Sequence, residues 1–413
     1  MQIKWNPAAL LRAEIVLPSS KSISNRVLVI NALSGAECAP NNVSVCDDTR
    51  VMLRALDEDA PTVDIMAAGT AMRFLTAYYA ATSGSDKVMT GTARMQQRPI
   101  RVLVDALRRL GAHIEYVKEE GFPPLHVSGR ALECREVALQ GSVSSQYISA
   151  LLMIGPKMKN GLTLHLEGDI ISRPYIDLTL RLMRDFGAEA GWVGEDCIKV
   201  EPKPYTPIPF TVESDWSAAS YWYEMVALAD DEGAEVVLPG LYAESYQGDS
   251  AVAELFGRLG VTTLYDRESG CVSLRKGACV AGRMDYDFVN QPDLAQTFVV
   301  TCCMLGMPFR FTGLQSLKIK ETDRMAALIC ELGKMGYVIR ESEDSVLEWD
   351  GARCEPQADV AIDTYEDHRM AMAFAPACMK LGVLHINNPQ VVSKSYPGFW
   401  DDLKSAGFTM EEE

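Results

Sequence analysis

The chain lacks long apolar runs and has no excess of basic residues. Its longest apolar stretch, "FVVTCCMLGMPF", is too short to cross a bilayer. The 39 Lys and Arg residues are outnumbered by 56 Asp and Glu residues, which gives a formal net charge of -17. Because nucleic acids are bound mainly through clustered basic side chains, we expect neither a nucleic acid nor a membrane as partner. A small anionic ligand requires the basic side chains to gather in one pocket.

Metal-binding and export signatures are missing as well. The chain has no CxxC pair and no His/Cys cluster that offers a zinc site, and its 11 cysteines are scattered. The N-terminus lacks a basic segment followed by a long apolar one, so we expect no signal peptide. These absences predict reduced cysteines, a cytoplasmic location and no bound metal.

The size and composition are those of a folded, two-domain protein. A chain of 413 residues is too long for one ordinary core, which favours two domains. Apolar residues make up 48% and charged residues 23%, far from the composition of disordered chains. The length and composition are therefore compatible with a folded enzyme.

One pattern recurs along the chain: an amphipathic helix, then a glycine, then an alternating strand, as in "VLVDALRRLGAHIEYV". Glycine at that place permits the left-handed residue that ends a helix. Five copies contain Gly111, Gly187, Gly260, Gly336 and Gly407, and "VMLRALDEDAPTVDI" reads as a sixth copy without glycine. Separations of roughly 71 to 76 residues predict six small α/β subdomains in two groups of three.

Local composition predicts where the chain crosses between domains. The proline-rich "PKPYTPIPF" precedes a helix that Ser214 or Asp215 can cap, so one crossover is placed near residue 213. The loop before Lys21 is the other. One lobe then comprises residues 1–18 and 214–413, and the second lobe comprises residues 19–213.

Several helix starts combine cations with small or hydroxyl residues. In "SSKSISNR", Ser19 or Ser20 can cap a helix. The free N–H groups at the start of this helix then face the same point as the side chains of Lys21 and Ser22, and Arg26 follows about one turn later. Helix N-termini attract anions, so a cation there indicates a ligand-facing group; a solvated surface lysine is the alternative.

Other stretches have the same character, and ordinary helix capping is an alternative for the stretch at Gly69 and for the stretch at Ser142. Gly69 and Thr70 open a helix with Arg73 three residues on, although the Walker spacing is absent. The remaining candidates are Arg94 and Arg98 in "RMQQRPI" and Ser142, Ser144, Ser145 and Gln146 ahead of an apolar helix.

The densest charge lies late in the chain. His368 and Arg369 open an uncharged helix that must be buried, which predicts both residues at the rim of a cleft. Lys394 is expected in a loop and Asp293 after a proline turn. "IKETDRM" adds Lys320, Glu321, Asp323 and Arg324.

Together these stretches resemble the 5-enolpyruvylshikimate-3-phosphate synthase family, in order from "PSSKSISNR" through "KETDR" and "DHRMAM" to "SKSYPGFW". The resemblance implies an α/β fold, a two-lobed inside-out α/β barrel in which each lobe has three βαβαββ repeats around a pseudo-threefold axis. It places the active site in the cleft between the lobes. It also implies transfer of the enolpyruvyl group of phosphoenolpyruvate to the 5-hydroxyl of shikimate 3-phosphate, through a tetrahedral ketal that expels phosphate, without a cofactor.

The resemblance also implies a set of site residues. Shikimate 3-phosphate would meet Lys21, Ser22, Arg26, Ser144, Ser145, Ser172, Tyr175, Asp293 and Lys320. Phosphoenolpyruvate would meet Lys21, Gly69, Arg98, Gln146, Arg324, His368, Arg369 and Lys394. The catalytic residues would be Lys21, Asp293, Glu321, His368 and Lys394, with Asp293 as the base and Glu321 as the acid toward C3.

The charges of this set match those of the two substrates, which together bring about -5 to -6. Asp293 and Glu321 reduce the charge of eight cations to +6, so we expect the lobes to rest apart until both anions arrive. The eight cations are Lys21, Arg26, Arg73, Arg98, Lys320, Arg324, Arg369 and Lys394.

Two departures from the family pattern bear on the phosphoenolpyruvate site. Ala67 stands where the family commonly has asparagine, and Phe74 stands where it has proline. Affinity for phosphoenolpyruvate and for the inhibitor glyphosate depends on this segment. Gly69 leaves room for glyphosate, so inhibition is expected to persist.

Two other functions fit parts of the pattern. The related UDP-N-acetylglucosamine enolpyruvyl transferase typically has a reactive cysteine in a mobile loop, but no cysteine lies between Thr90 and Val104. A non-catalytic phosphosugar-binding protein of the same fold would gain affinity by losing Asp293 and Glu321. For the enzyme we expect a monomer that acts on small molecules.

Overall fold

The computed structural model describes residues 1–411, which form two compact units. Unit 1 contains residues 1–18 and the chain from Glu213 onward, and unit 2 contains residues 19–212. Glu213, predicted in the second lobe, belongs with unit 1. Its carboxylate accepts hydrogen bonds from the Ser245 hydroxyl, the Tyr246 backbone N–H and the Gln247 side chain, all in unit 1.

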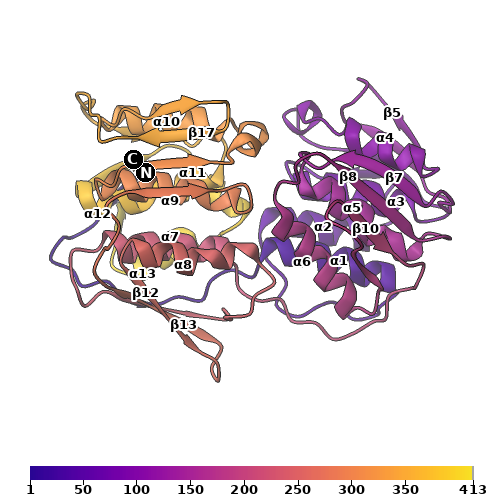
Figure 1. Cartoon of the computed structure of the whole chain (residues 1–413), viewed down its shortest axis with the longest axis horizontal. Helices are drawn as coiled ribbons and strands as arrows, with labels where there is room; N and C mark the ends of the chain where they lie inside the picture. The colour runs from indigo at the N-terminus through magenta and orange to yellow at the C-terminus, as the bar shows by residue number, and fades with distance from the viewer. Residues whose placement is uncertain (412–413) are drawn as a thin grey trace. The chain divides into compact units, whose positions relative to one another are not determined.

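Unit 1 contains three four-stranded sheets within the described residues (Figure 1). The first has the order β12-β13-β11-β2, from Val261–Asp266, Cys271–Lys276, Glu235–Pro239 and Arg12–Glu14. The second has the order β14-β15-β17-β16, from Met284–Asp287, Phe309–Thr312, Val346–Trp349 and Arg340–Ser342. The third has the order β18-β19-β1-β20, from Ala361–Ile362, Val383–Ile386, Gln2–Lys4 and Thr409–Glu411.

The interior of unit 1 consists of helices α7 (Trp216–Leu228), α9 (Ala295–Met304) and α11 (His368–Phe374). Helix α9 packs against both of the others, and every residue of α9 and α11 is buried. A helix that is apolar on all sides is stable only when it is enclosed, which explains this arrangement. The outer helices are α8 (Val252–Arg258), α10 (Arg324–Lys334), α12 (Cys378–Leu381) and α13 (Phe399–Ser405).

Unit 2 contains two four-stranded sheets within the described residues. One has the order β3-β4-β6-β5, from Thr62–Asp64, Asp86–Thr90, Leu125–Ser128 and His113–Tyr116. The other has the order β7-β8-β10-β9, from Glu136–Gln140, Leu162–Glu167, Cys197–Val200 and Ala190–Trp192. Helices α1 (Lys21–Ser34), α3 (Gly69–Ala80) and α5 (Ser145–Ile154) pack against one another, and α2 (Asp47–Asp57), α4 (Arg101–Arg109) and α6 (Arg173–Asp185) complete the unit.

The predicted α/β repeat is confirmed in the element order. The segments β3-α3-β4-α4-β5-β6, β7-α5-β8-α6-β9-β10 and β14-α9-β15-α10-β16-β17 each follow the order βαβαββ. The five predicted glycines all have positive φ, between 84° and 105°, one residue beyond a helix cap. Helix α2, the copy without glycine, ends at Glu58 in an extended conformation. That copy has its two helices, but within the described chain its sheet is reduced to an isolated bridge between Asn41 and Thr211.

No helix within residues 1–411 is long and apolar enough to cross a membrane.

Candidate active site

Several predicted site residues of unit 1 lie at helix starts. Asp293 lies in the 3-10 turn η4 (Pro292–Leu294), which leads into α9, and Arg324 is the first residue of α10. His368 and Arg369 open α11. Orphan N–H groups and the helix dipole make such positions favourable for anions.

Arg324 is the centre of an ion-pair cluster. Its side chain is buried, and its guanidinium contacts Asp367 through two bonds, Nε–Oδ2 at 2.7 Å and Nη2–Oδ1 at 3.2 Å. It also contacts Asp293 at 3.2 Å and Glu321 at 3.1 Å. Burial opposes the charge of Arg324, but the three carboxylates outweigh it and raise the pKa of this guanidinium. Arg324 therefore stays charged and holds all three acids in place.

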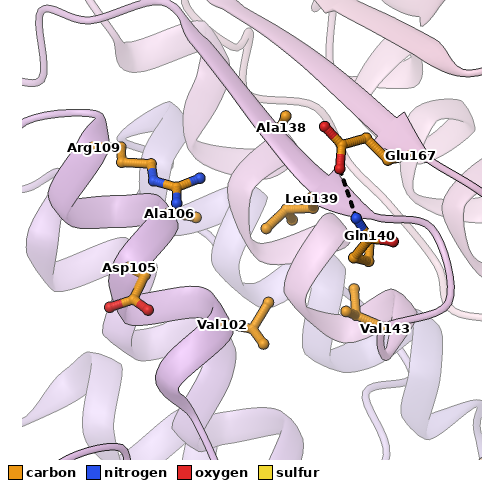
Figure 2. Close-up of a pocket in the computed structure, with 9 residues that line it drawn as sticks. All are labelled: Val102, Asp105, Ala106, Arg109, Ala138, Leu139, Gln140, Val143 and Glu167. Atoms are coloured by element: carbon orange, nitrogen blue, oxygen red, sulfur yellow. Dashed lines mark hydrogen bonds between the residues drawn. The ribbon is translucent and has the colours of Figure 1, made fainter.

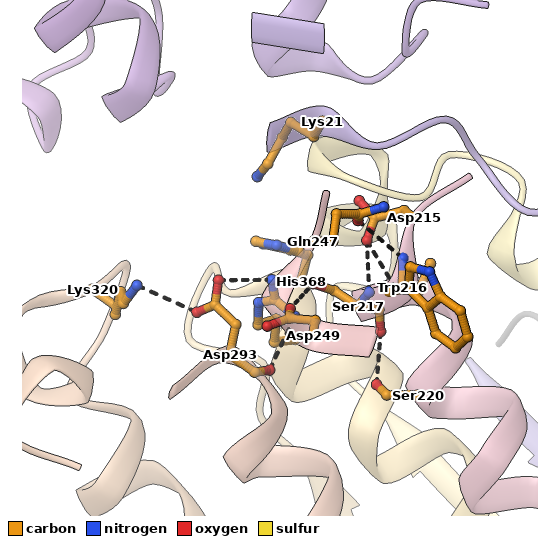
Figure 3. Close-up of polar contacts among 12 residues, drawn as sticks. Lys21, Asp215, Trp216, Ser217, Ser220, Gln247, Asp249, Asp293, Lys320 and His368 are labelled. Carbon is orange, nitrogen blue, oxygen red and sulfur yellow. Dashed lines mark hydrogen bonds and ion pairs between the residues drawn. The ribbon is translucent and has the colours of Figure 1, made fainter. Parts of the chain in front are cut away.

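Asp293 is held by two further cations, one of which, Lys320, is drawn beside it in Figure 3. Arg369 Nη2 lies 3.0 Å from Oδ2 of Asp293, and Lys320 Nζ lies 3.3 Å from Oδ1. Burial disfavours the Asp293 carboxylate, but Arg369, Lys320 and Arg324 together lower its pKa well below the usual range. In this state Asp293 is ionised and a weak base.

The other predicted residues of unit 1 adjoin this cluster. Lys394 Nζ lies 2.9 Å from Glu321. Lys394, expected in a loop, is the last residue of the 3-10 helix η7 (Pro389–Lys394). His368 and Arg369, expected at a rim, are 2% and 8% exposed. Asp367, the N-cap of α11, accepts the backbone N–H of Arg369 at 3.0 Å, which fixes the helix start beside the cluster.

Lys21 of unit 2 begins α1, which Ser20 caps by accepting the N–H of Ile23. Its ammonium lies 3.5 Å from Asp48 in the first turn of α2, and the Asp48 side chain is 6% exposed. Sequence reasoning missed Asp48, because acids are common in the first turn of any helix, where the helix dipole favours them.

Arg26, predicted to bind shikimate 3-phosphate, bonds to the interior of unit 2. It donates to the Thr179 hydroxyl at 2.7 Å, to the Ser149 hydroxyl at 3.0 Å and to the Ser22 carbonyl at 3.0 Å. Burial lowers the pKa of Arg26 to about 10, so the side chain stays charged at neutral pH. Arg26 thereby links α1 to α5 and α6 and fixes the backbone of Ser22.

Two arginines meet at the start of α3. Arg73 Nη1 donates to the carbonyl of Gly69 at 2.8 Å. A Cβ atom added to Gly69 would lie 2.6 Å from Arg98 Nη1 and 2.7 Å from Arg73 Nη1, so both guanidinium groups cover this glycine. Gln146 donates to the Thr70 hydroxyl at 3.1 Å. The fold thus brings together Gly69, Arg98 and Gln146, three residues predicted for one ligand.

The predicted hydroxyl residues lie at two neighbouring helix starts. Ser144 caps α5, with Ser145 as the first residue of that helix. Ser172 is the N-cap of α6 in a left-handed conformation with φ of 55°, and Tyr175 lies in the first turn. Helices α5 and α6 pack against each other, and the Ile171 N–H donates to the Gly141 carbonyl at 3.2 Å, which joins the segments that lead into the two helices.

A pocket of about 300 Å³ lies elsewhere in unit 2, between α4 and the strands β7 and β8 (Figure 2). Gln140 donates to Glu167 at 2.6 Å, and both residues line the pocket. The lining carries Arg109 but also Asp105 and Glu167, so its net charge is negative. This pocket suits a phosphorylated acid less well than the helix starts do, and the predicted site residues lie outside its lining. Within the part of the chain that is described, no group of three or more His, Cys, Asp or Glu side chains could hold a metal ion.

The fold has counterparts among solved structures. Two structures of the EPSP synthase from Acinetobacter baumannii match the chain with TM-scores of 0.78 and 0.77, at 21% identity and over 100% of both chains. This likeness defines the class of protein, an α/β protein of two repeat-built units.

Sequence comparison defines the family within that class. A family model described as EPSP synthase (3-phosphoshikimate 1-carboxyvinyltransferase) matches residues 56–403. A 3-phosphoshikimate 1-carboxyvinyltransferase of Bacteroides fragilis is 62% identical over 398 residues, 96% of each chain. One of Vibrio cholerae is 35% identical over 425 residues, 96% of this chain and 97% of its own. The chain therefore belongs to the EPSP synthase family, which confirms the resemblance seen in the sequence.

Proposed function

We propose that the protein transfers the enolpyruvyl group of phosphoenolpyruvate to the 5-hydroxyl of shikimate 3-phosphate and releases phosphate. Family membership supports this reaction. The observation that supports it most directly is the contact of Asp293 with Lys320, Arg324 and Arg369, because these cations match anionic substrates and the carboxylate matches a base. A binding protein for two anions would gain from losing Asp293.

In this proposal the substrates themselves activate the base. Phosphate and carboxylate groups compete with Asp293 for Lys320, Arg324 and Arg369, so substrate binding weakens the attraction that lowers the Asp293 pKa. Asp293 then takes the proton of the 5-hydroxyl while the oxygen forms a bond to C2 of phosphoenolpyruvate. Glu321, which takes up a proton from solvent when the substrate anions draw Arg324 and Lys394 away from it, gives that proton to C3, which yields the ketal.

The ketal breaks down when the Glu321 carboxylate takes a proton back from C3 and the bond from C2 to the phosphate oxygen breaks, so that the electron pair of this bond leaves with phosphate. Lys394, 2.9 Å from Glu321, orients this acid in the free protein and stabilises phosphate as it departs. Lys21, Arg98 and Gln146 of unit 2 are proposed for the same two ligands. We also propose that the protein acts in the cytoplasm as a monomer and without a cofactor, as its acidic composition and dispersed cysteines suggest.

The test is phosphate release with both substrates and with either one omitted. Turnover that requires both supports the proposal. If UDP-N-acetylglucosamine replaced shikimate 3-phosphate as the acceptor, the assignment would move to the related cell-wall transferase.

Gly69→Ala should raise the KM for phosphoenolpyruvate by about tenfold, with a smaller effect on kcat. The added Cβ would lie 2.6 Å from Arg98 Nη1 and 2.7 Å from Arg73 Nη1, so the two guanidinium groups must move from the start of α3. Both contacts are with the ends of flexible side chains, so the fold should persist. Steady-state kinetics measure the change.

Gly191→Ala is the matched control, because a Cβ at Gly191 meets no atom within 4 Å. An unchanged KM for phosphoenolpyruvate in Gly69→Ala would contradict the placement of this ligand at α3.

A further inference from the structure

Asp249 is a buried carboxylate beside the ion-pair cluster that the proposed mechanism does not use. It lies in the 3-10 turn η3 (Gly248–Ala251) and is 3% exposed. Its Oδ2 accepts a hydrogen bond from the hydroxyl of Ser217 in the first turn of α7. The N–H of Ser217 in turn donates to the N-cap Asp215 at 2.8 Å, which fixes the backbone that carries this hydroxyl.

Charged groups on three neighbouring elements act on Asp249. Asp293 of η4, Arg369 of α11 and Asp215 at the start of α7 interact with its charge, and Asp249 in turn acts on Tyr286 of β14. Figure 3 draws Asp249 next to Asp293. Arg369, which contacts Asp293 at 3.0 Å, therefore lies in the field of both carboxylates.

The pKa of Asp249 lies within the pH range in which the protein can be assayed. Burial and then the negative charge of Asp293 raise the pKa of Asp249 to about 6, although the Ser217 hydrogen bond opposes the shift. Asp249 is thus mostly ionised at pH 7 and mostly neutral at pH 5. Asp293 stays ionised over the same range, because Arg369, Lys320 and Arg324 outweigh the effect of its burial on its pKa.

We propose that Asp249 is a positioning residue whose negative charge keeps Asp293 basic enough to act, by offsetting part of the field of Arg369 and its neighbouring cations. The inference rests on the proposed role of Asp293 as the base. When Asp249 is protonated, the cations act on Asp293 without this opposition and Asp293 becomes a weaker base. Activity then falls, although Asp293 itself remains ionised.

The test is the pH dependence of kcat for phosphate release between pH 4.5 and 8. Wild type should show an acid limb in kcat where Asp249 gains its proton in the substrate complex, whereas the pKa of about 6 belongs to the free protein. Asp249→Asn should lower kcat at neutral pH by about threefold to tenfold and abolish that limb, because the amide stays neutral at every pH.

Ser217→Ala tests the same coupling in the opposite direction. It removes the hydrogen bond that stabilises the ionised form of Asp249, so the acid limb should move to higher pH. Asp401→Asn is the control, because the Asp401 side chain is 84% exposed and pairs only with a surface lysine in the contacts described, and its profile should match that of wild type.

A second readout is independent of turnover. With carboxyl-13C aspartate, the resonance of Asp293 should report an inflection near pH 6 in wild type and none in Asp249→Asn. An unchanged acid limb in Asp249→Asn, or no such inflection in the Asp293 resonance of wild type, overturns the inference. Absence of phosphate release from wild type at every pH would instead overturn the proposed function, and the resonance would still decide whether Asp249 acts on Asp293.

Discussion

Asp293→Asn should lower kcat for phosphate release by about 10²- to 10⁴-fold, the range expected for loss of a general base. The amide cannot accept the proton of the attacking hydroxyl at any pH. It has nearly the same shape as the carboxylate, so the contacts with Lys320 and Arg369 change in charge more than in position.

The same substitution should leave the KM for phosphoenolpyruvate unchanged or lower it. Removal of one negative charge leaves Lys320, Arg324 and Arg369 less compensated, which favours anions. A loss of kcat with retained affinity distinguishes the loss of a base from general damage to the site.

Asp285→Asn is the matched control, because Asp285 pairs with Arg283 at the surface of the same unit and is 59% exposed. Its kinetics should equal those of wild type. If Asp293→Asn kept more than a tenth of the wild-type kcat, the base would have to be another residue.

Local features of the fold could be predicted because they depend on neighbours in sequence. Gly187 and Gly336, for example, each adopt positive φ after a helix, since a glycine directly after an apolar helical pattern commonly supplies the left-handed residue that ends the helix. Asp215 and Ser20 cap their helices as expected, and Ser144 does the same. These signals span a few residues and need no knowledge of tertiary contacts.

The sheet of the sixth repeat could not be predicted from local sequence signals. The helical pattern of residues 51–65 predicts a subdomain like the others, and α2 forms there. The strands depend on partners far along the chain, and Asn41 pairs with Thr211 at a separation of 170 residues. A short helical period carries no information about such a pairing.

The summed charge of the predicted site residues was also predicted incompletely. The expected sum of +6 omitted Asp48 and Asp367, which pair with Lys21 and Arg324. Subtracting these two carboxylates as well from the eight cations leaves +4 for the same residues. Each omitted acid lies at a helix start, where the sequence alone explains it as an N-cap or as a favourable charge near the helix dipole. Its ion pair with a cation of the predicted set is visible only in the folded structure.

Asp367→Ala should be among the most destabilising single substitutions at the site, at about 3 to 5 kcal/mol. Asp367 is fully buried and forms two bonds to Arg324, which is 1% exposed. Removal of the carboxylate leaves a buried guanidinium with only Asp293 and Glu321 as carboxylate partners in the contacts described. It also removes the cap that accepts the Arg369 N–H, a further cost of about 1 kcal/mol.

For a unit of about 200 residues, the summed loss of about 4 to 6 kcal/mol corresponds to a decrease in Tm of roughly 8 to 24 °C, measured by calorimetry. Asp367→Asn should cost less, because asparagine is also a good N-cap and only the ion pair is lost. Asp344→Asn is the control: Asp344 pairs with Lys318 but is 91% exposed, so water replaces the contact. Asparagine also tolerates the φ of 54° at this position, so Tm should not change. Equal Tm values for Asp367→Ala and Asp344→Asn would mean that the buried Arg324 guanidinium gains little from Asp367, and the cluster would then owe its geometry to Asp293 and Glu321.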